Sequence, residues 1–323
     1  MRAFIRTEYG SPDVLELSDV PRPTPEADEV LVRVVASSVN MADVDYLLGR
    51  PSIARLGTGL RRPRNPRLGL DVAGEVEVVG ANVTHFGTGD EVFGDLTAYG
   101  FGGFAEYVCA PEAAFALKPL NMTFEEAAAV PQAAVMALQG LCGKRPIRPG
   151  DRVLINGAGG NIGPFAVQIA KSLGAEVTAV DSMKKLEMLR RIGADHVIDY
   201  GAVDYTENGL RYDRIFDIAA FGSILASRRS LTRNGVYVMV PGTIPGLFRA
   251  MFLAPLISMF GSRKMSMLAW KPFRQEDVVF LKELIVSGDL KSIIDRTFPF
   301  SRIPKALEYQ QHGHPQGKIT IQM

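Results

Sequence analysis

The stretch from Asp151 to Tyr200 begins DRVLINGAGGNIGPFAVQIAKSLGAEVTAVDSMKK and closes with GADHVIDY. Val153 to Ile155 form a short apolar run bounded by polar residues, which is typical of a strand covered on both faces. A glycine loop follows at once, and apolar residues then recur at helical spacing up to Gly174. A second apolar strand, 176–180, ends in Asp181. The stretch is therefore predicted to fold as strand, glycine turn, helix and strand.

This unit has the physical properties of a dinucleotide site. Gly157, Gly160 and Gly163 supply a turn that a ligand can approach closely, and N–H groups at the helix start favour a pyrophosphate. Asp181 lies about 20 positions further on, where an acidic residue meets the adenosine ribose in such units. The alternative is a glycine turn in an α/β fold that binds no ligand. The surrounding strand and helix pattern favours the dinucleotide.

Length and composition limit the remaining classes. A chain of 323 residues exceeds the usual size of one core, so two domains are expected. The formal net charge of +1 gives no electrostatic argument for nucleic acid. The two cysteines, Cys109 and Cys142, can form neither a disulfide framework nor a four-thiolate zinc site, which favours a cytoplasmic location. No signal peptide or membrane span is predicted.

The first hundred residues are predicted to be mostly β-structure. Short strands with glycine turns between them favour a small barrel over a parallel sheet. The strands are expected at 2–6, 15–17, 30–35, 71–79, 91–93 and 104–109.

Helices and strands alternate in the second half. A helix starts at Thr123 and is interrupted by Pro131, and after the central unit a helix is expected at 186–192. Strands are predicted at 196–198, 214–218 and 236–240, helices at 276–286 and 303–310, and a last strand at 318–322. The pattern predicts a doubly wound parallel sheet, and the final strand is expected to return to the first domain. We place the dinucleotide-binding domain at 123–265 and the substrate domain at 1–122 and 266–323.

The segment Gly246 to Phe260, GLFRAMFLAPLISMF, is the most apolar long segment. Arg249 and Pro255 interrupt it, and it is too short to span a bilayer. We consider a hydrophobic pocket wall or subunit contact and, as the alternative, membrane association. The length argument favours the former.

The whole chain resembles the medium-chain dehydrogenase/reductase superfamily, and within it the zinc-free quinone oxidoreductase and enone reductase branch. The resemblance rests on EYGSPDVLEL, SVNMAD, GLDVAGEVEVVG, GDEVFG, GGFAEYV, EEAAAVP, GAGGNIG, GADHVIDY, RYDRIFDIA and HPQGKI, which occur in order along the chain. It implies a GroES-like β-barrel domain followed by a Rossmann domain, with the C-terminus rejoining the barrel and the active site in the cleft between the domains.

The resemblance also bears on zinc. Zinc alcohol dehydrogenases of this superfamily have a cysteine where this chain has Asn40 and a histidine where it has Leu70. Neither residue can bind the metal in that manner. The histidines, His85, His196, His312 and His314, show no partners at ligand spacing. We therefore predict no catalytic metal.

Without zinc, hydride transfer to a conjugated acceptor remains reasonable chemistry. The resemblance implies that Asn40 and Asp43 line the nicotinamide cleft and that Tyr46 donates a hydrogen bond to the substrate oxygen. The alternative for Asn40 and Asp43 is a turn and cap pair at the end of a strand.

The cofactor is predicted to be NAD or NADP. Asp181 can accept hydrogen bonds from the ribose hydroxyls of NAD. Ser182, Lys184 and Lys185 follow it, and relatives specific for NADP have a serine and a basic side chain there. Because an acidic residue at the strand tip is fixed by the sheet whereas the lysines are mobile, we expect NAD to be usable. The full set of predicted cofactor-binding residues is Gly157, Gly160, Asn161, Ile162, Gly163, Asp181, Ser182, Lys184, Lys185, Tyr200 and Gly242.

Three functions remain open from the sequence. The leading hypothesis is a zinc-independent NAD(P)H-dependent reductase of small quinones or α,β-unsaturated carbonyls. The second is a metal-free alcohol dehydrogenase. The third is a nucleotide-binding sensor or interaction protein with little turnover, because Met136 and Ala220 depart from the family pattern near the cofactor. A homodimer is expected from the resemblance.

Overall fold

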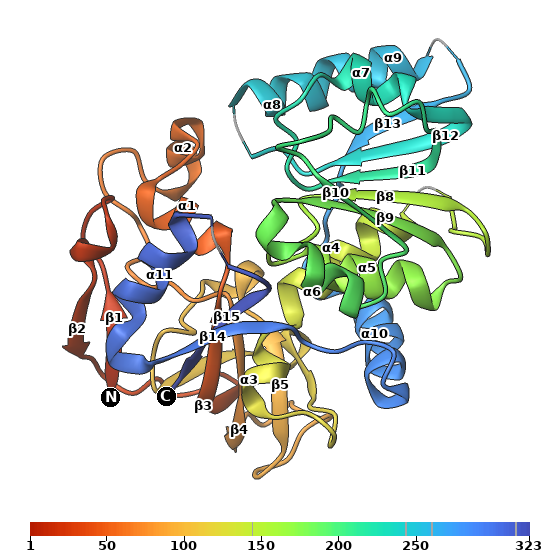
Figure 1. The fold of residues 1–323 in the computed structure, drawn as a ribbon. Helices are drawn as coiled ribbons and strands as arrows, with labels where there is room; N and C mark the ends of the chain where they lie inside the picture. The colour runs from red at the N-terminus through yellow and green to blue at the C-terminus, as the bar shows by residue number, and fades with distance from the viewer. Residues whose placement is uncertain (144, 243, 260, 314) are drawn as a thin grey trace. The chain divides into compact units, whose positions relative to one another are not determined.

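A computed structural model describes residues 1–143, 145–242, 244–259, 261–313 and 315–323 of the chain. The chain divides into two compact units (Figure 1). Unit 1 comprises Met1–Val135, Pro272–Val286 and Ser292–Met323, and unit 2 comprises Met136–Lys271 and Ser287–Lys291. The domain limits predicted from the sequence, 122/123 and 265/266, stay a prediction.

Unit 2 contains a six-stranded, fully parallel sheet in the order β10-β9-β8-β11-β12-β13. Its strands are β8 (Arg152–Asn156), β9 (Glu176–Asp181), β10 (His196–Asp199), β11 (Tyr212–Asp217), β12 (Leu231–Met239) and β13 (Lys264–Met267). The sheet extends from β8 in two directions, with β9 and β10 on one side and β11, β12 and β13 on the other. This is the predicted doubly wound Rossmann arrangement.

Helices cover both faces of this sheet, as Figure 1 shows for α5 and α6 on one face and α7 to α9 on the other. They are α5 (Gly163–Ser172), α6 (Leu186–Arg191), α7 (Ile224–Arg229), α8 (Ile244–Phe248), a π-helical turn at Arg249–Leu253, and α9 (Ala254–Met259). Because β8 is covered on both sides, its central residues, Val153, Leu154 and Ile155, are apolar and fully buried.

Unit 1 contains a seven-stranded sheet and a two-stranded ribbon, β1-β2. The sheet has the order β14-β15-β3-β4-β5-β7, and β6 pairs with β3 beside that path. The strands are β1 (Arg2–Ile5), β2 (Glu16–Asp19), β3 (Glu29–Val39), β4 (Asp71–Val79), β5 (Glu91–Asp95), β6 (Tyr107–Pro111), β7 (Phe115–Leu117), β14 (Ile294–Pro299) and β15 (Lys318–Gln322). The β-rich first domain expected from the short strands is confirmed.

Five helices complete the description of unit 1 and its limits. They are α1 (Met41–Leu48), α2 (Arg55–Thr58), α3 (Phe124–Ala128), α10 (Gln275–Ser287) and α11 (Ile303–Gln311), and α4 (Pro131–Cys142) runs across the division between the units. Short 3-10 turns occur at Pro12–Val14, Ser52–Ala54, Thr97–Tyr99, Glu112–Ala114, Met183–Lys185 and Phe300–Arg302.

The C-terminal strand returns to the first domain, as predicted. Strand β15 pairs antiparallel with β3, with Ile319 opposite Val39 and Ile321 opposite Ser37. Ile319 and Ile321 pack with residues of α1 and α11 in one buried cluster. This pairing carries Lys318, the first residue of β15, into the interior of unit 1.

The sequence analysis did not predict the helices α1, α2, α7, α8 and α9 or the strands β7, β13 and β14. Helix α1 follows β3 after the single residue Asn40, so strand and helix patterns meet without a polar gap. Strands β7, β13 and β14 are short or only half-buried, and their apolar alternation is weak.

No helix in the part of the chain that the structure describes is long and apolar enough to cross a membrane.

Candidate functional site

The glycine loop of unit 2 lies between β8 and α5, where the sequence predicted it. Gly163 is the first residue of α5, and a Cβ there would lie 2.2 Å from the Ala158 carbonyl oxygen. Gly157 has a φ of 81°, which favours glycine. The loop therefore requires glycine to bring its backbone close to the helix start, which is the geometry that cradles a phosphate.

Asp181, at the end of β9, fixes this loop. Its Oδ2 accepts a hydrogen bond from the Gly159 N–H at 2.7 Å, and its Oδ1 accepts from the Ser182 N–H at 2.8 Å. The side chain of Lys185 is buried and its Nζ lies 3.6 Å from Asp181 Oδ1. The expectation that both lysines are mobile is therefore wrong for Lys185, whereas Lys184 is exposed.

The other predicted cofactor residues of unit 2 lie at the same edge of the sheet. Tyr200 follows β10, is exposed, and donates its backbone N–H to the Asp181 carbonyl oxygen at 3.2 Å. Gly242 follows β12 and is exposed. Asn161 and Ile162 lie in the loop before α5, and Asn161 does not adopt the left-handed conformation that its residue type allows. The carboxyl edge of a doubly wound sheet is where such folds bind ligands.

Sequence reasoning missed two contributors to this edge. Gly159 was passed over in favour of its neighbour Gly160, although a Cβ on Gly159 would lie 2.6 Å from Lys185 Cδ. Asp217, at the end of β11, accepts hydrogen bonds from Asn156 Nδ2 at 2.8 Å and from the Tyr237 hydroxyl at 2.7 Å. The sequence did contain a signal for Asp217, because it is a polar residue at the end of an apolar strand.

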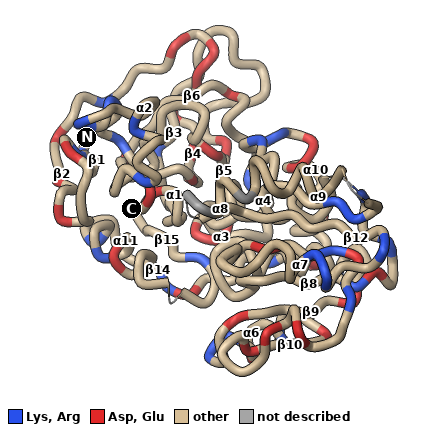
Figure 2. Tube along the Cα trace, turned by 90° about the horizontal axis from the view of Figure 1, so that it is seen from above, with Lys and Arg blue, Asp and Glu red and all other residues tan. Residues whose placement is uncertain are grey.

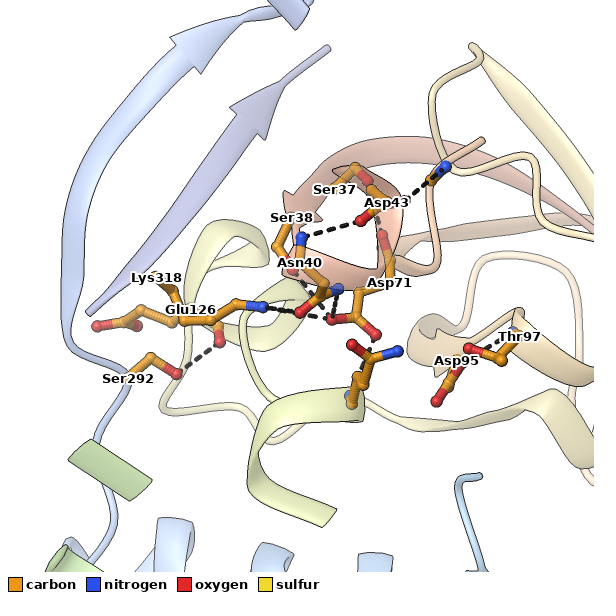
Figure 3. Close-up of polar contacts among 12 residues, drawn as sticks. Ser37, Ser38, Asn40, Asp43, Asp71, Asp95, Thr97, Glu126, Ser292 and Lys318 are labelled. Atoms are coloured by element: carbon orange, nitrogen blue, oxygen red, sulfur yellow. Dashed lines mark hydrogen bonds and ion pairs between the residues drawn. The ribbon is translucent and has the colours of Figure 1, made fainter. Parts of the chain in front are cut away.

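Unit 1 buries a cluster of charged side chains around Asn40, as Figure 3 shows. Asp71, the first residue of β4, is fully buried, and Asn40 Nδ2 donates to its Oδ2 at 2.9 Å. Lys318 Nζ donates to Asn40 Oδ1 at 2.6 Å and lies 3.5 Å from Asp71 Oδ2. Ser38 Oγ donates to Asp71 Oδ2 at 3.0 Å. The Asn40 amide is thus held at both ends.

The pKa values in this cluster move in opposite directions. Burial raises the pKa of Asp71, and the Lys318 ammonium, Asn40 and Ser38 act against that rise. Burial lowers the pKa of Lys318, and Asp71 opposes this change. Because each group compensates the charge of the other, we describe the two as a buried ion pair.

Asp43 caps the start of α1 in this site. Its Oδ2 accepts from the Asn40 N–H at 2.9 Å and its Oδ1 from the Gly69 N–H at 3.1 Å, so it caps α1. Burial raises the pKa of Asp43 to about 7. The turn and cap alternative describes these contacts, and a place for Asp43 beside the nicotinamide stays a prediction.

Asp95, at the end of β5, is the least satisfied acid of the cluster. It lies opposite Asp71 in the strand register. Its Oδ1 accepts from the Thr97 N–H at 2.8 Å, whereas no donor among the described residues reaches its buried Oδ2. Burial, then Asp71, raises the pKa of Asp95 to about 7. Asp95 therefore changes its charge close to neutral pH and is protonated below it.

Tyr46, on α1, packs its ring against Phe101 with 4.8 Å between ring centroids. The backbone carbonyl of Tyr46 accepts from the Arg6 guanidinium, and no hydrogen bond to its hydroxyl occurs among the described residues. Burial, then Asp43 and Asp95, raises the pKa of Tyr46. Tyr46 is therefore a neutral hydroxyl that can donate to an incoming oxygen.

The donor set at Asn40 does not fit a zinc ion. Asn40 Oδ1 accepts from the Lys318 ammonium, and Leu70 offers only hydrocarbon. The described residues contain no group of three or more His, Cys, Asp or Glu that could hold a metal. His85 and His196 do have carboxylate neighbours, Glu112 at 3.0 Å and Glu176 at 2.8 Å, but each lies in an exposed single pair. His314 lies outside the described residues.

Two family models match the chain. The alcohol dehydrogenase GroES-like domain matches residues 26–120, and the zinc-binding dehydrogenase model matches residues 192–321. The second name is the name of the family model.

The chain is similar to curated proteins over its whole length. It is 32% identical to the 2-methylene-furan-3-one reductase of Solanum lycopersicum, over 99% of this chain and 79% of that protein. It is 31% identical to the chloroplast envelope quinone oxidoreductase homolog of Arabidopsis thaliana, over 100% of this chain and 98% of that protein.

Solved structures show the same fold. The quinone oxidoreductase from Coxiella burnetii superposes with a TM-score of 0.86 and 29% identity, covering 100% of this chain and 99% of that chain. The CurK enoyl reductase superposes with a TM-score of 0.88 and 27% identity, with the same coverage. With its GroES-like and Rossmann domains and relatives along its full length, the chain belongs to the quinone oxidoreductase branch of the medium-chain dehydrogenase/reductase superfamily.

Proposed function

We propose that this protein is a zinc-independent, NAD(P)H-dependent oxidoreductase that reduces small quinones or α,β-unsaturated carbonyl compounds. The glycine loop, which the 2.7 Å hydrogen bond from the Gly159 N–H to Asp181 holds in place, carries the proposal, because its geometry suits the pyrophosphate of a dinucleotide. The names of the relatives, a furanone reductase and a quinone oxidoreductase homolog, support the substrate class.

The chain's own residues provide binding and positioning. A bound reduced nicotinamide supplies the hydride. The N–H groups at the start of α5 hold the pyrophosphate, and Asp181 accepts hydrogen bonds from ribose hydroxyls. Tyr46 donates a hydrogen bond to the substrate carbonyl oxygen, where negative charge develops. Asn40 and Asp43 set the position of α1 and so of Tyr46.

The chemistry of the donor set supports the proposed zinc independence. A metal at Asn40 would have to displace the Lys318 ammonium from the amide oxygen and would find no second soft or nitrogen ligand at Leu70. A conjugated acceptor needs no Lewis acid of this kind, because the product charge delocalises before it is protonated.

NADH is proposed as a usable cofactor, with NADPH as an alternative. The Asp181 carboxylate repels a ribose 2′-phosphate, but Lys185 lies 3.6 Å away and reduces its charge. The exposed Lys184 can reach a phosphate from solvent. The balance between these groups decides the preference.

The decisive experiment measures oxidation of NADH and of NADPH with a panel of quinones and enones in the presence of a chelator. The expected result is reduction that chelation leaves unchanged, with a saturated carbonyl compound or a hydroquinone as the product. Loss of activity on chelation with recovery on adding zinc would contradict zinc independence. Carbonyl reduction to an alcohol would favour the metal-free alcohol dehydrogenase. Tight binding of both cofactors without any turnover would favour the sensor, for which the half-buried Met136 and the buried Ala220 remain the relevant departures.

A homodimer and a cytoplasmic location remain part of the proposal. The two cysteines, Cys109 and Cys142, form no disulfide, which suits a reducing compartment. Several relatives are named as chloroplastic or mitochondrial, so the location needs a direct test. Light scattering on the purified protein and fractionation of the source cells measure the two properties.

A further inference from the structure

The apolar segment of unit 2 has two apolar faces. One face packs on the sheet: Ala250 and Ala254 are buried in a cluster with Tyr237 and Met265. The other face points to solvent, with Phe248, Met251, Phe252, Leu256 and Met259 all between 53% and 75% exposed. A helix that is apolar on all sides is normally buried on all sides. We therefore expect a binding partner to cover the outer face.

The outer side chains form one stripe. Phe248, Met251, Phe252, Leu256 and Met259 recur at three- and four-residue spacing along α8, the π-helical turn and α9. Phe248 and Phe252 stack on one another, with ring centroids 5.8 Å apart. Leu225 of α7 is also exposed, and with Leu256, Ile257 and Arg228 it lines a shallow groove of ≈ 280 Å³. The neighbouring helix therefore extends the apolar stripe.

The charges around this stripe have one sign. Residues 218–271 contain no aspartate or glutamate. Over the same range the chain has the cations Arg228, Arg229, Arg233, Arg249, Arg263, Lys264 and Lys271. In Figure 2, where Lys and Arg are blue, cations lie at the end of α7 and in the segment after α9. The surface thus combines exposed apolar side chains with a segment whose charged residues are all cations.

Contacts bring several of these cations together at one end of the stripe. Arg263 Nε donates to the Thr232 carbonyl oxygen at 3.1 Å, and Ser262 Oγ donates to the carbonyl oxygen of Arg233. Arg229, Arg233, Arg263 and Lys264 pair with no carboxylate among the described residues. One acid reaches this end, Asp213, whose carboxylate accepts from Thr232 Oγ1 and from the Arg152 N–H. The cations are available to an anionic partner.

We propose that the stripe of α8 and α9, with the cations beside it, docks the protein on the surface of an anionic lipid bilayer. Exposed phenylalanine and methionine side chains enter the boundary between headgroups and acyl chains, and the arginines and Lys264 contact lipid phosphates. A second copy of the chain fits less well, because a two-fold contact presents the same acid-free segment 218–271 to itself and so supplies no carboxylate from that segment to the cations. The segment lies on the surface and does not cross the membrane. This differs from the pocket wall or subunit contact that the sequence favoured.

The test is sedimentation of the purified full-length protein with vesicles of phosphatidylcholine alone and of phosphatidylcholine mixed with phosphatidylglycerol. The expected result is partitioning at least about tenfold stronger onto the anionic vesicles, which rising salt weakens. The double variant Phe248→Ser/Phe252→Ser and the triple variant Arg229→Gln/Arg233→Gln/Lys264→Gln are each expected to lose about tenfold or more.

Matched variants elsewhere provide the control. Leu56→Ser removes an equally exposed apolar side chain in unit 1, and Lys305→Gln removes an exposed cation there. Both are expected to partition like the wild type. Unchanged NADH binding and thermal midpoints show that the test variants are folded.

Three outcomes would overturn the proposal. The first is absent or equal partitioning on the two kinds of vesicle. The second is partitioning that neither test variant reduces. The third is a dimer that Phe248→Ser/Phe252→Ser dissociates while the wild type ignores vesicles, which would assign the stripe to a second copy. None of these outcomes depends on which substrate the enzyme reduces.

Discussion

Lys318 Nζ and Asp71 Oδ2 lie 3.5 Å apart in the interior of unit 1, and neither side chain has any exposed surface. The two residues are 247 positions apart in the chain. They meet because β15 pairs with β3, which in turn pairs with β4, whose first residue is Asp71. The ion pair thus joins β15, the last strand of the chain, to β4, close to Asn40 and the start of α1.

Removing the cation should destabilise the protein strongly. Lys318→Met leaves Asp71 buried without its opposite charge, and we expect a loss of about 3–5 kcal/mol in the free energy of unfolding. The double variant Lys318→Met/Asp71→Asn should recover part of this loss, because no charge is then left uncompensated. Urea unfolding followed by circular dichroism measures both.

The exposed pair of Lys305 and Glu308, 2.9 Å apart, is the matched control. Lys305→Met should leave the unfolding midpoint unchanged. A Lys318→Met protein as stable as the wild type would show that the buried pair does not hold β15 in place.

Asp95 should make the protein less stable as the pH rises. Its pKa is raised from 3.8 to about 7 in the folded protein, so the folded state binds its proton more tightly than the unfolded state does. The resulting stability is fully present below pH 3.8 and is lost as the pH rises to about 7. Asp95→Asn removes the charge and can still accept from the Thr97 N–H, so we expect it to stabilise the protein at pH 8 by on the order of 2 kcal/mol.

The pH series distinguishes Asp95 from its neighbours. Asp43, whose pKa is also raised to about 7, contributes a loss with the same sign and should keep part of the slope in Asp95→Asn. Asp71 and Lys318 face Asp95 in the same cluster and stay paired. If Asp95→Asn is less stable than the wild type at pH 8 and equally stable at pH 5, the carboxyl group is ionised and bonded in the native protein.

The glycine loop could be predicted from the sequence because its signal is local. Strand, glycines, helix and Asp181 follow one another within about thirty residues, which matches a known βαβ unit. The 2.7 Å hydrogen bond from the Gly159 N–H to Asp181 also joins two residues of this same stretch. A sequence pattern can reveal a site of this kind because its residues are close together in the chain.

The buried cluster of unit 1 could not be predicted in this way. Asp71, Asp95 and Lys318 come from three distant strands, and only the register of β15, β3, β4 and β5 brings them together. In the sequence each is a single charged residue at the edge of an apolar strand, which normally marks a strand end exposed to solvent. Helix α1 was missed for a related reason, because its cap, Asn40, directly follows β3.

Gly163→Ala should weaken cofactor binding by displacing the loop. The added methyl group would lie 2.2 Å from the Ala158 carbonyl oxygen, so the start of α5 must move. We expect the dissociation constant for NADH to rise about tenfold or more, and the protein to lose about 1–3 kcal/mol of stability. Fluorescence titration with NADH and thermal unfolding measure the two effects.

Two further glycines calibrate this result. In Gly160→Ala the nearest atom to the methyl group is 3.8 Å away, so the fold should be retained and any loss of NADH affinity would report on the ligand. In Gly57→Ala nothing lies within 4 Å, so neither property should change. Equal effects of Gly163→Ala and Gly57→Ala would contradict the cradle.

Asp181→Asn should shift the cofactor preference toward NADPH. Asparagine keeps an oxygen that can accept from the Gly159 N–H, so the loop is retained, but the charge that repels a 2′-phosphate is lost and Lys185 becomes uncompensated. We expect the ratio of kcat/KM for NADPH to that for NADH to rise about tenfold or more. An unchanged ratio would mean that Asp181 serves only to hold the loop.

Tyr46→Phe should lower kcat by about 10- to 100-fold with little change in KM, because the hydroxyl acts on the charge that develops in the transition state. The variant keeps the ring that packs on Phe101, so a packing role alone predicts unchanged activity. Tyr309→Phe is the control: Tyr309 lies on α11 and its hydroxyl donates to Asp295 of β14 at 2.7 Å, so its removal should not change kcat. Because burial, Asp43 and Asp95 raise the pKa of Tyr46 above 10.0, the hydroxyl stays protonated, and the rate advantage of the wild type over Tyr46→Phe should persist up to pH 10. Steady-state kinetics across pH on both variants tests the assignment, and a Tyr46→Phe enzyme with wild-type kcat would remove Tyr46 from the reaction.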